Sequence, residues 1–270
     1  VPSAPMDARR AARRDLTVLA VAVIAVSRAA DGPVLWAIGA LLFAAVVVGW
    51  LQVVSEGEPR GVPLESLLLP GSVVLAGLGG VRLVPLGPAL IPAVAVVGVL
   101  LDRCMALEAR LVRATSGPTE DDRTELLVLA MVTAFVGFAG AASILPGGLA
   151  EPVGEASPLD PARLAALAAA DAGLAGLLAY RIVALGRPSL RSALIAAVTS
   201  AILIAVTAGA LRALAVPRLI GPAALTVVLF LWTSIQAARS ARRDARWVWE
   251  LVLLGVLGVL VVAMNLRLSG

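Results

Sequence analysis

The sequence is built from long continuous apolar runs, separated by short breaks rich in charged residues, proline and glycine. A helix needs about 20 consecutive apolar residues to cross a hydrocarbon layer about 30 Å thick. A transmembrane barrel would instead show alternating segments of about 10 residues. The pattern therefore predicts an all-α fold, a polytopic bundle of transmembrane helices with eight or nine spans.

Nine segments of the chain are expected to cross the membrane, several of which are shorter than about 20 residues. The expected spans are 16–30, 33–54, 66–83, 86–101, 126–146, 161–185, 192–211, 219–237 and 248–266. The composition agrees, because 60% of the residues are hydrophobic, whereas soluble domains average about 45–50% apolar. In water, that excess would leave apolar surface exposed and prone to aggregation. We therefore expect the lipid bilayer to be the main partner of the chain.

The placement of arginine predicts the orientation of these helices. With the N-terminus in the cytoplasm and the spans alternating, 16 of the 22 basic residues fall on the cytoplasmic side and 6 on the outer side. Cytoplasmic connections of membrane proteins are enriched in Lys and Arg. The expected outer loop, residues 147–160, contains acidic residues but no arginine. The sequence thus predicts a multi-pass protein of the bacterial inner membrane with a cytoplasmic N-terminus.

The first expected span, 16–30, has two interpretations. Residues 9–29 combine a basic start, a short apolar core and small residues at Ser27 and Ala29. That combination is also typical of a signal peptide that is cleaved from the mature protein. Cleavage would leave eight spans and the same orientation for the rest of the chain.

The order of the breaks divides the chain into segments and suggests an internal repeat. Asp31 and Gly32 precede Pro33 at one break, and Asp160 precedes Pro161 at another. Spans two to five can be aligned with spans six to nine, which predicts a parallel 4+4 repeat. Such repeats are related by an axis along the membrane normal. The expected segments are a basic N-terminus 1–15, the first span 16–30, a four-helix unit 31–146, the outer loop 147–160 and a second four-helix unit 161–270.

Two local patterns predict details of the helices. Asp102 to Arg113 is expected to continue the fourth helix past the membrane, and Thr119 with Asp122 resembles a capping box that begins the next helix. Gly77, like its neighbours Gly79 and Gly80, is expected at a helix contact, because small residues let transmembrane helices approach closely.

Residues 60–266 resemble a family of uncharacterised bacterial polytopic membrane proteins, described only as a domain of unknown function. The resemblance rests on Glu65-Ser66-Leu67-Leu68-Leu69-Pro70, on the Pro85-Leu86-Gly87 break and on the order of the spans. It implies a membrane-embedded helical architecture and no particular activity.

The residue types that are missing exclude several kinds of chemistry. The sequence contains no His and no Lys, and Cys104 is its one cysteine. Catalytic Ser-His or Cys-His pairs, His metal ligands and Lys Schiff bases are therefore excluded. The arginines occur at the ends of apolar runs and not in a stripe with interleaved aromatics, which argues against nucleic-acid binding. We expect no enzymatic activity, no catalytic residues, no metal and no cofactor.

Asp171 is the one acidic residue well inside an expected span. It lies 10 residues after Pro161, which is about 15 Å along a helix and near the middle of the bilayer. An acid at that depth costs about 2.5–3.5 kcal/mol, so it should face protein or water. Its helix is rich in Ala and Gly. Asp171 is therefore the candidate intramembrane polar site, with structural burial as the alternative interpretation.

Three arginines near outer span ends, Arg28, Arg82 and Arg212, are weaker candidates for contact with an anion or a lipid headgroup. Long arginine side chains also reach headgroups simply by extending along the helix. The leading functional hypothesis is transport of a small or lipidic solute. The alternatives are a structural or accessory subunit of a membrane complex, including self-association, and a lipid-modifying membrane enzyme.

Overall fold

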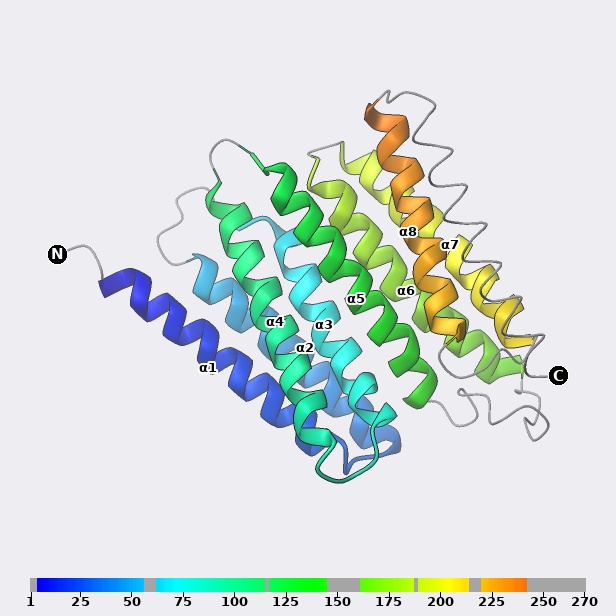
Figure 1. Ribbon diagram of the computed structural model, residues 1–270, viewed down its shortest axis with the longest axis horizontal. Helices are drawn as coiled ribbons and strands as arrows, with labels where there is room; N and C mark the ends of the chain where they lie inside the picture. Colours follow the sequence, from blue (N-terminus) through cyan, green and yellow to red (C-terminus); the bar gives the residue numbers. More distant parts are fainter. Residues whose placement is uncertain are drawn as a thin grey trace. The chain divides into compact units, whose positions relative to one another are not determined.

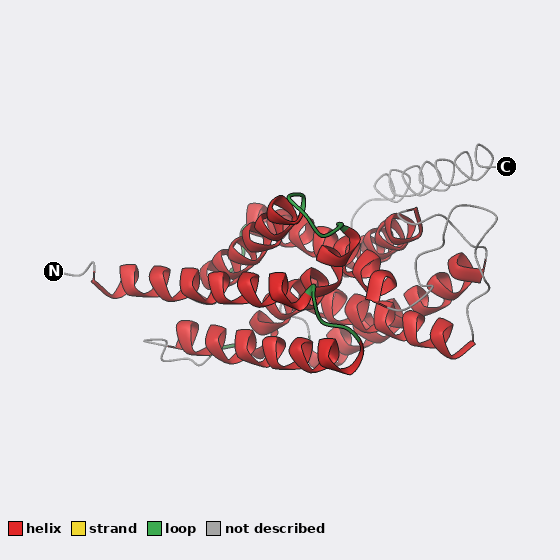
Figure 2. Cartoon of the chain, turned by 90° about the horizontal axis from the view of Figure 1, so that it is seen from below, coloured by secondary structure: helices red, strands yellow, loops and turns green. Residues whose placement is uncertain are grey.

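The computed structural model describes residues 4–55, 62–114, 117–144, 161–186, 189–213 and 220–241. These segments are helical apart from short connections, and no strand occurs within them (Figure 2). The elements, shown in Figure 1, are α1 (Ala4–Ser27), α2 (Gly32–Ser55), η1 (Leu64–Leu67), α3 (Leu68–Gly80), η2 (Val81–Leu83), α4 (Leu90–Arg113), α5 (Glu120–Ile144), α6 (Pro161–Ala184), α7 (Leu190–Ala213) and α8 (Ile220–Ala241).

Seven helices of the described residues are long and apolar enough to cross a membrane. They are α2, α3 with its flanking 3₁₀ turns η1 and η2, and α4 to α8. Each corresponds to one of the expected spans from 33–54 to 219–237, so the all-helical fold with long apolar helices is confirmed. This fold is compatible with a multi-pass membrane protein. The ninth expected span, 248–266, lies outside the described residues.

The first helix differs from the expected span 16–30. α1 begins 12 residues earlier, at Ala4, because its Ala- and Arg-rich start also favours a helix. α1 is not one of the seven long apolar helices, since its arginines leave an apolar part of only about 18 Å from Leu16 onward. Ala20 and Ile24 on this helix are buried, and α1 packs against α2, α3 and α4. Membrane crossing by α1, and its alternative as a cleaved signal, stay predictions.

The chain divides into two compact units, Val1–Thr133 and Ala134–Gly270. The boundary falls inside α5, whereas the sequence placed the division at the loop 147–160. A compact unit is defined by which helices pack together, and a continuous helix can contribute to both units. The 4+4 repeat stays a prediction, because the last helix of its second copy lies outside the described residues.

In the first unit, α3 packs against α1, α2 and α4, and most of its residues are buried. Glycine makes this packing close. A Cβ atom added to Gly77 would lie 2.6 Å from Cγ1 of Val97 on α4 and 3.2 Å from Cδ1 of Ile24 on α1. A Cβ at Gly71 would lie 2.5 Å from Cε2 of Phe43 on α2. The expected role of Gly77 in a helix contact is confirmed.

In the second unit, α6 packs along α7, and α8 contacts both of these helices. A Cβ added to Gly176 would approach the carbonyl oxygen of Ala197 and Cβ of Ala201 to 3.4 Å each. The α7–α8 contact includes a polar bridge, in which Nε2 of Gln236 donates a hydrogen bond to Oγ1 of Thr199 over 3.0 Å. Small side chains therefore set the close spacing between α6 and α7.

The connection between α4 and α5 follows the sequence prediction. α4 continues to Arg113, and α5 begins at Glu120. Oγ1 of Thr119 accepts a hydrogen bond from the Asp122 amide over 3.2 Å, while Oδ2 of Asp122 accepts one from the Thr119 amide over 3.2 Å. This reciprocal pair is a capping box and satisfies amides at the start of α5. Arg110 forms ion pairs with both Asp122 and Glu125 and joins the two helices.

Candidate functional site

Asp171 lies in the second unit on the buried face of α6, and its side chain is fully buried. Leu167, Ala175 and Leu178 are also fully buried, and their spacing places them on the same side of the helix as Asp171. α6 begins at Pro161, as expected, which confirms the position of Asp171 near the middle of the helix. The sequence therefore located the one acid buried in this helix.

The same helix has a second buried charged residue, Arg181, which is 4% exposed. It follows Asp171 by 10 residues, or about 15 Å along the helix axis. In the sequence, Arg181 is one of the 16 arginines expected on the cytoplasmic side, and its burial is not evident. The spacing from Leu178 would have placed it near the buried face. α6 thus combines an acid and a base inside a helix of small residues, and both are expensive to bury unless their environment stabilises them.

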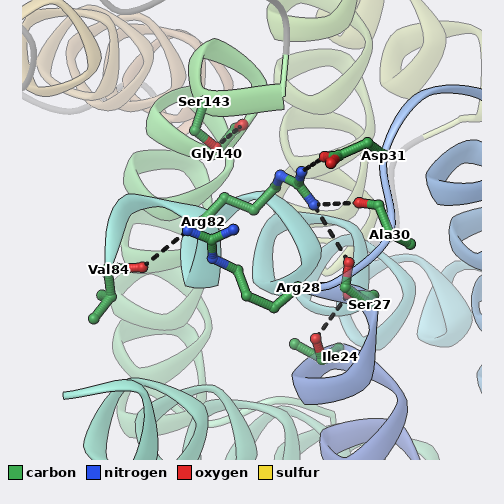
Figure 3. A network of polar contacts seen from close by, with 9 residues as sticks. All are labelled: Ile24, Ser27, Arg28, Ala30, Asp31, Arg82, Val84, Gly140 and Ser143. Atoms are coloured by element: carbon green, nitrogen blue, oxygen red, sulfur yellow. Dashed lines mark hydrogen bonds and ion pairs between the residues drawn. The ribbon is translucent and has the colours of Figure 1, made fainter. Parts of the chain in front are cut away.

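The expected outer arginines of the first unit, Arg28 and Arg82, are brought together where α1 ends and η2 leads to α4 (Figure 3). The guanidinium of Arg82 donates to the carbonyl oxygen of Ala30 over 2.9 Å and to that of Ser27 over 3.3 Å. It also pairs with the carboxylate of Asp31. A cation at a helix C-terminus satisfies carbonyl groups that have no partner within the helix. Arg82 therefore ties the end of α1 to η2.

Arg28 makes a much weaker contribution to this network. Its Nη2 donates to the carbonyl oxygen of Val84 over 3.5 Å, which is the long limit for a hydrogen bond. The side chain of Arg212, the third outer candidate, lies outside the described residues. Contact of these arginines with an anion or headgroup stays a prediction. The hydrogen bonds of Arg82 also give this residue a structural role.

A cavity of about 480 Å³, which was not predicted from the sequence, lies in the first unit. It lies where α1 begins and where α2 and α4 end, and five arginines line it together with Trp50 and small apolar residues. We call it the basic cavity. Its arginines are Arg9, Arg10 and Arg13 of α1 and Arg110 and Arg113 of α4.

The sequence contains a signal for this cavity, although it is indirect. The arginines belong to two clusters separated by about 100 residues, and both clusters are expected on the cytoplasmic side. Orientation rules place them in the same leaflet, but they do not show that α1 and α4 are neighbours. The packing of α1 against α4 is a tertiary contact, which the structure shows (Figure 1).

Comparisons with protein-family models, with curated proteins and with solved structures found no match to this chain.

Proposed function

We propose that the protein is a multi-pass membrane protein that handles a small or lipidic solute, with Asp171 as the central polar group of its pathway. The observation that supports this proposal is the complete burial of Asp171 on the small-residue helix α6. Ionisable residues inside transmembrane segments are rare and commonly mark substrate, ion or proton pathways. The helix that carries this acid packs closely against α7 at Gly176.

A proton-coupled pathway is the form of this proposal that can be tested without knowing the solute. Purified protein is reconstituted into liposomes that contain an entrapped pH-sensitive dye, and a pH gradient is imposed. We expect proton flux above that of protein-free liposomes, and we expect Asp171→Asn to reduce it at least about tenfold, because the amide cannot bind and release a proton. Asp121→Asn is the matched control, since Asp121 is exposed at the start of α5.

Two results would contradict the proposal. Flux in Asp171→Asn equal to that of the unmodified protein would remove the role given to this carboxyl group. Absence of flux in the unmodified protein, together with its co-purification with a fixed partner, would favour the alternative, a structural subunit of a membrane complex.

The proposal also includes an orientation, in which the N-terminus and the α4–α5 connection face the cytoplasm of a bacterial cell. The distribution of arginine supports it, because 16 of the 22 arginines then lie on the cytoplasmic side. A phosphatase reporter that is active only outside the cytoplasm should be active when fused within 147–160. The same reporter should be inactive when fused after Ala114. The reverse pattern would show that the orientation is wrong.

A further inference from the structure

Among the described residues that line the basic cavity of the first unit, five are arginines and none carries a carboxylate. Nε of Arg13 lies 2.9 Å from Oδ1 of Asp102, and Arg110 is paired with two acids of α5. Arg113 uses its Nε to donate to the carbonyl oxygen of Ala109 over 2.9 Å. No carboxylate of the described residues pairs with Arg9, Arg10 or Arg113. Among the described residues, three guanidinium groups therefore have no carboxylate partner.

The remaining wall of the cavity is apolar. Trp50, Val53 and Val54 of α2 line one part, and Ala106 and Ala109 of α4 line another. Trp50 is fully buried, so the apolar surface that a ligand can reach is mainly aliphatic. A cavity with basic groups beside an apolar wall suits a ligand that is both anionic and amphiphilic.

The position of the cavity along the helices agrees with an anionic, amphiphilic ligand. α2 contains 24 residues, which is about 36 Å of helix and exceeds a hydrocarbon layer of about 30 Å. Its last residues, near Val54, are therefore expected to reach the headgroup region. The arginines of α1 precede the apolar run that begins at Leu16, and those of α4 follow its apolar run. In the proposed orientation, the arginines would therefore lie near the level of lipid phosphates in one leaflet.

We propose that the basic cavity binds the phosphate of a ligand that carries net negative charge, with Arg9, Arg10 and Arg113 as the principal contacts. Guanidinium groups form paired, charge-assisted hydrogen bonds with phosphate oxygens. Basic pockets between helices on the cytoplasmic side are a recognised kind of site for anionic lipid headgroups. The volume is within the range of small-molecule sites, about 300–1,000 Å³. This site is independent of Asp171, so either proposal can fail without the other.

Calorimetric titration of the purified protein in a neutral detergent tests the proposal and identifies the source of the phosphate. The probes are short-chain phosphatidylglycerol, short-chain phosphatidylcholine and inorganic phosphate. We expect phosphatidylglycerol to bind at least about tenfold more tightly than phosphatidylcholine and to weaken as salt screens the arginines. Binding of inorganic phosphate with equal affinity would instead identify a soluble phosphate compound as the ligand, and would support the same site.

Two double variants distinguish binding by the cavity arginines from attraction to the general surface charge. Arg9→Gln with Arg113→Gln removes two cavity arginines and should weaken binding at least about tenfold, because charge-assisted bonds are lost. Arg14→Gln with Arg103→Gln removes the same charge from exposed positions of the same two helices that do not line the cavity. This control should stay within about twofold of the unmodified protein.

Replacement by lysine tests the geometry of the contacts, because it removes neither the positive charge nor the fold. Arg9→Lys with Arg113→Lys keeps both charges but removes the paired geometry, so we expect intermediate affinity. Equal affinities for phosphatidylglycerol and phosphatidylcholine, or equal losses in the cavity and control variants, would overturn the proposal. No detectable binding of either phosphatidylglycerol or inorganic phosphate would overturn it as well.

Discussion

Replacing Gly77 with alanine is expected to lower the free energy of unfolding of the first unit by about 1–3 kcal/mol, because the added methyl group overpacks a tight core. The Cβ atom would lie 2.6 Å from Val97 and 3.2 Å from Ile24, so side chains of two other helices must both move. Leucine at this position adds three more carbon atoms to the same contact. We expect Gly77→Leu to yield little or no folded protein.

Gly173→Ala is the matched control for this substitution. Gly173 also lies within a transmembrane helix, but a Cβ atom there would meet nothing within 4 Å. Alanine is favoured over glycine in helices by about 1 kcal/mol, so stability should be unchanged or slightly increased. Thermal unfolding of both variants in detergent, followed by circular dichroism, measures the difference. Equal melting temperatures for Gly77→Ala and the unmodified protein would show that α3 does not pack as described.

Replacing Arg82 with methionine is expected to lower the free energy of unfolding by about 2–3 kcal/mol, since hydrogen bonds from a charged donor contribute about 1.5–3 kcal/mol. Methionine keeps an unbranched apolar chain but removes every donor to Ser27, Ala30 and Asp31. The side chain of Arg82 is 11% exposed, whereas that of Asp31 is 84% exposed. Most of the loss should therefore come from the bonds to the carbonyl groups, because exposed ion pairs contribute little.

Arg28→Met provides the comparison within the same network. Arg28 makes one hydrogen bond, at 3.5 Å, so its loss should cost about 0.5 kcal/mol or less, at the low end for a neutral hydrogen bond. The difference between the two variants in denaturant-induced unfolding isolates the contribution of the Arg82 contacts. Similar losses in both would mean that the arginines act only as charges near the headgroups.

Much of the secondary structure was predictable because transmembrane helices are specified locally. A backbone in lipid must satisfy its own hydrogen bonds, so a long apolar run has few alternatives to a helix. Pro161 marks the start of α6, and Thr119 with Asp122 marks the start of α5, as expected. α1 begins earlier than expected. The expected span included only the apolar residues from Leu16 onward, whereas the alanines and arginines before Leu16 also favour a helix.

The candidate sites were predictable to different degrees. Asp171 was found because a lone acid in an apolar helix is visible in the sequence itself, and its burial confirms its position facing protein. The burial of Arg181 was missed, because an arginine near a span end usually extends toward the headgroups. The capping contacts of Arg82 depend on residues about 50 positions earlier, which no local pattern reveals.

By itself, the sequence determined that this chain forms apolar helices, where most of them begin and end, and that α6 holds an acid facing protein. The burial of Glu108 on α4 was not evident from the sequence. Hydrophobic length, proline, glycine and capping residues act over a few neighbouring positions, so they can be read along the chain. The tertiary structure alone decided that α1 lies beside α4, that α3 packs among three other helices, and that distant arginines line one cavity. In lipid, apolar surface does not distinguish one partner helix from another, so close packing and polar contacts decide the arrangement.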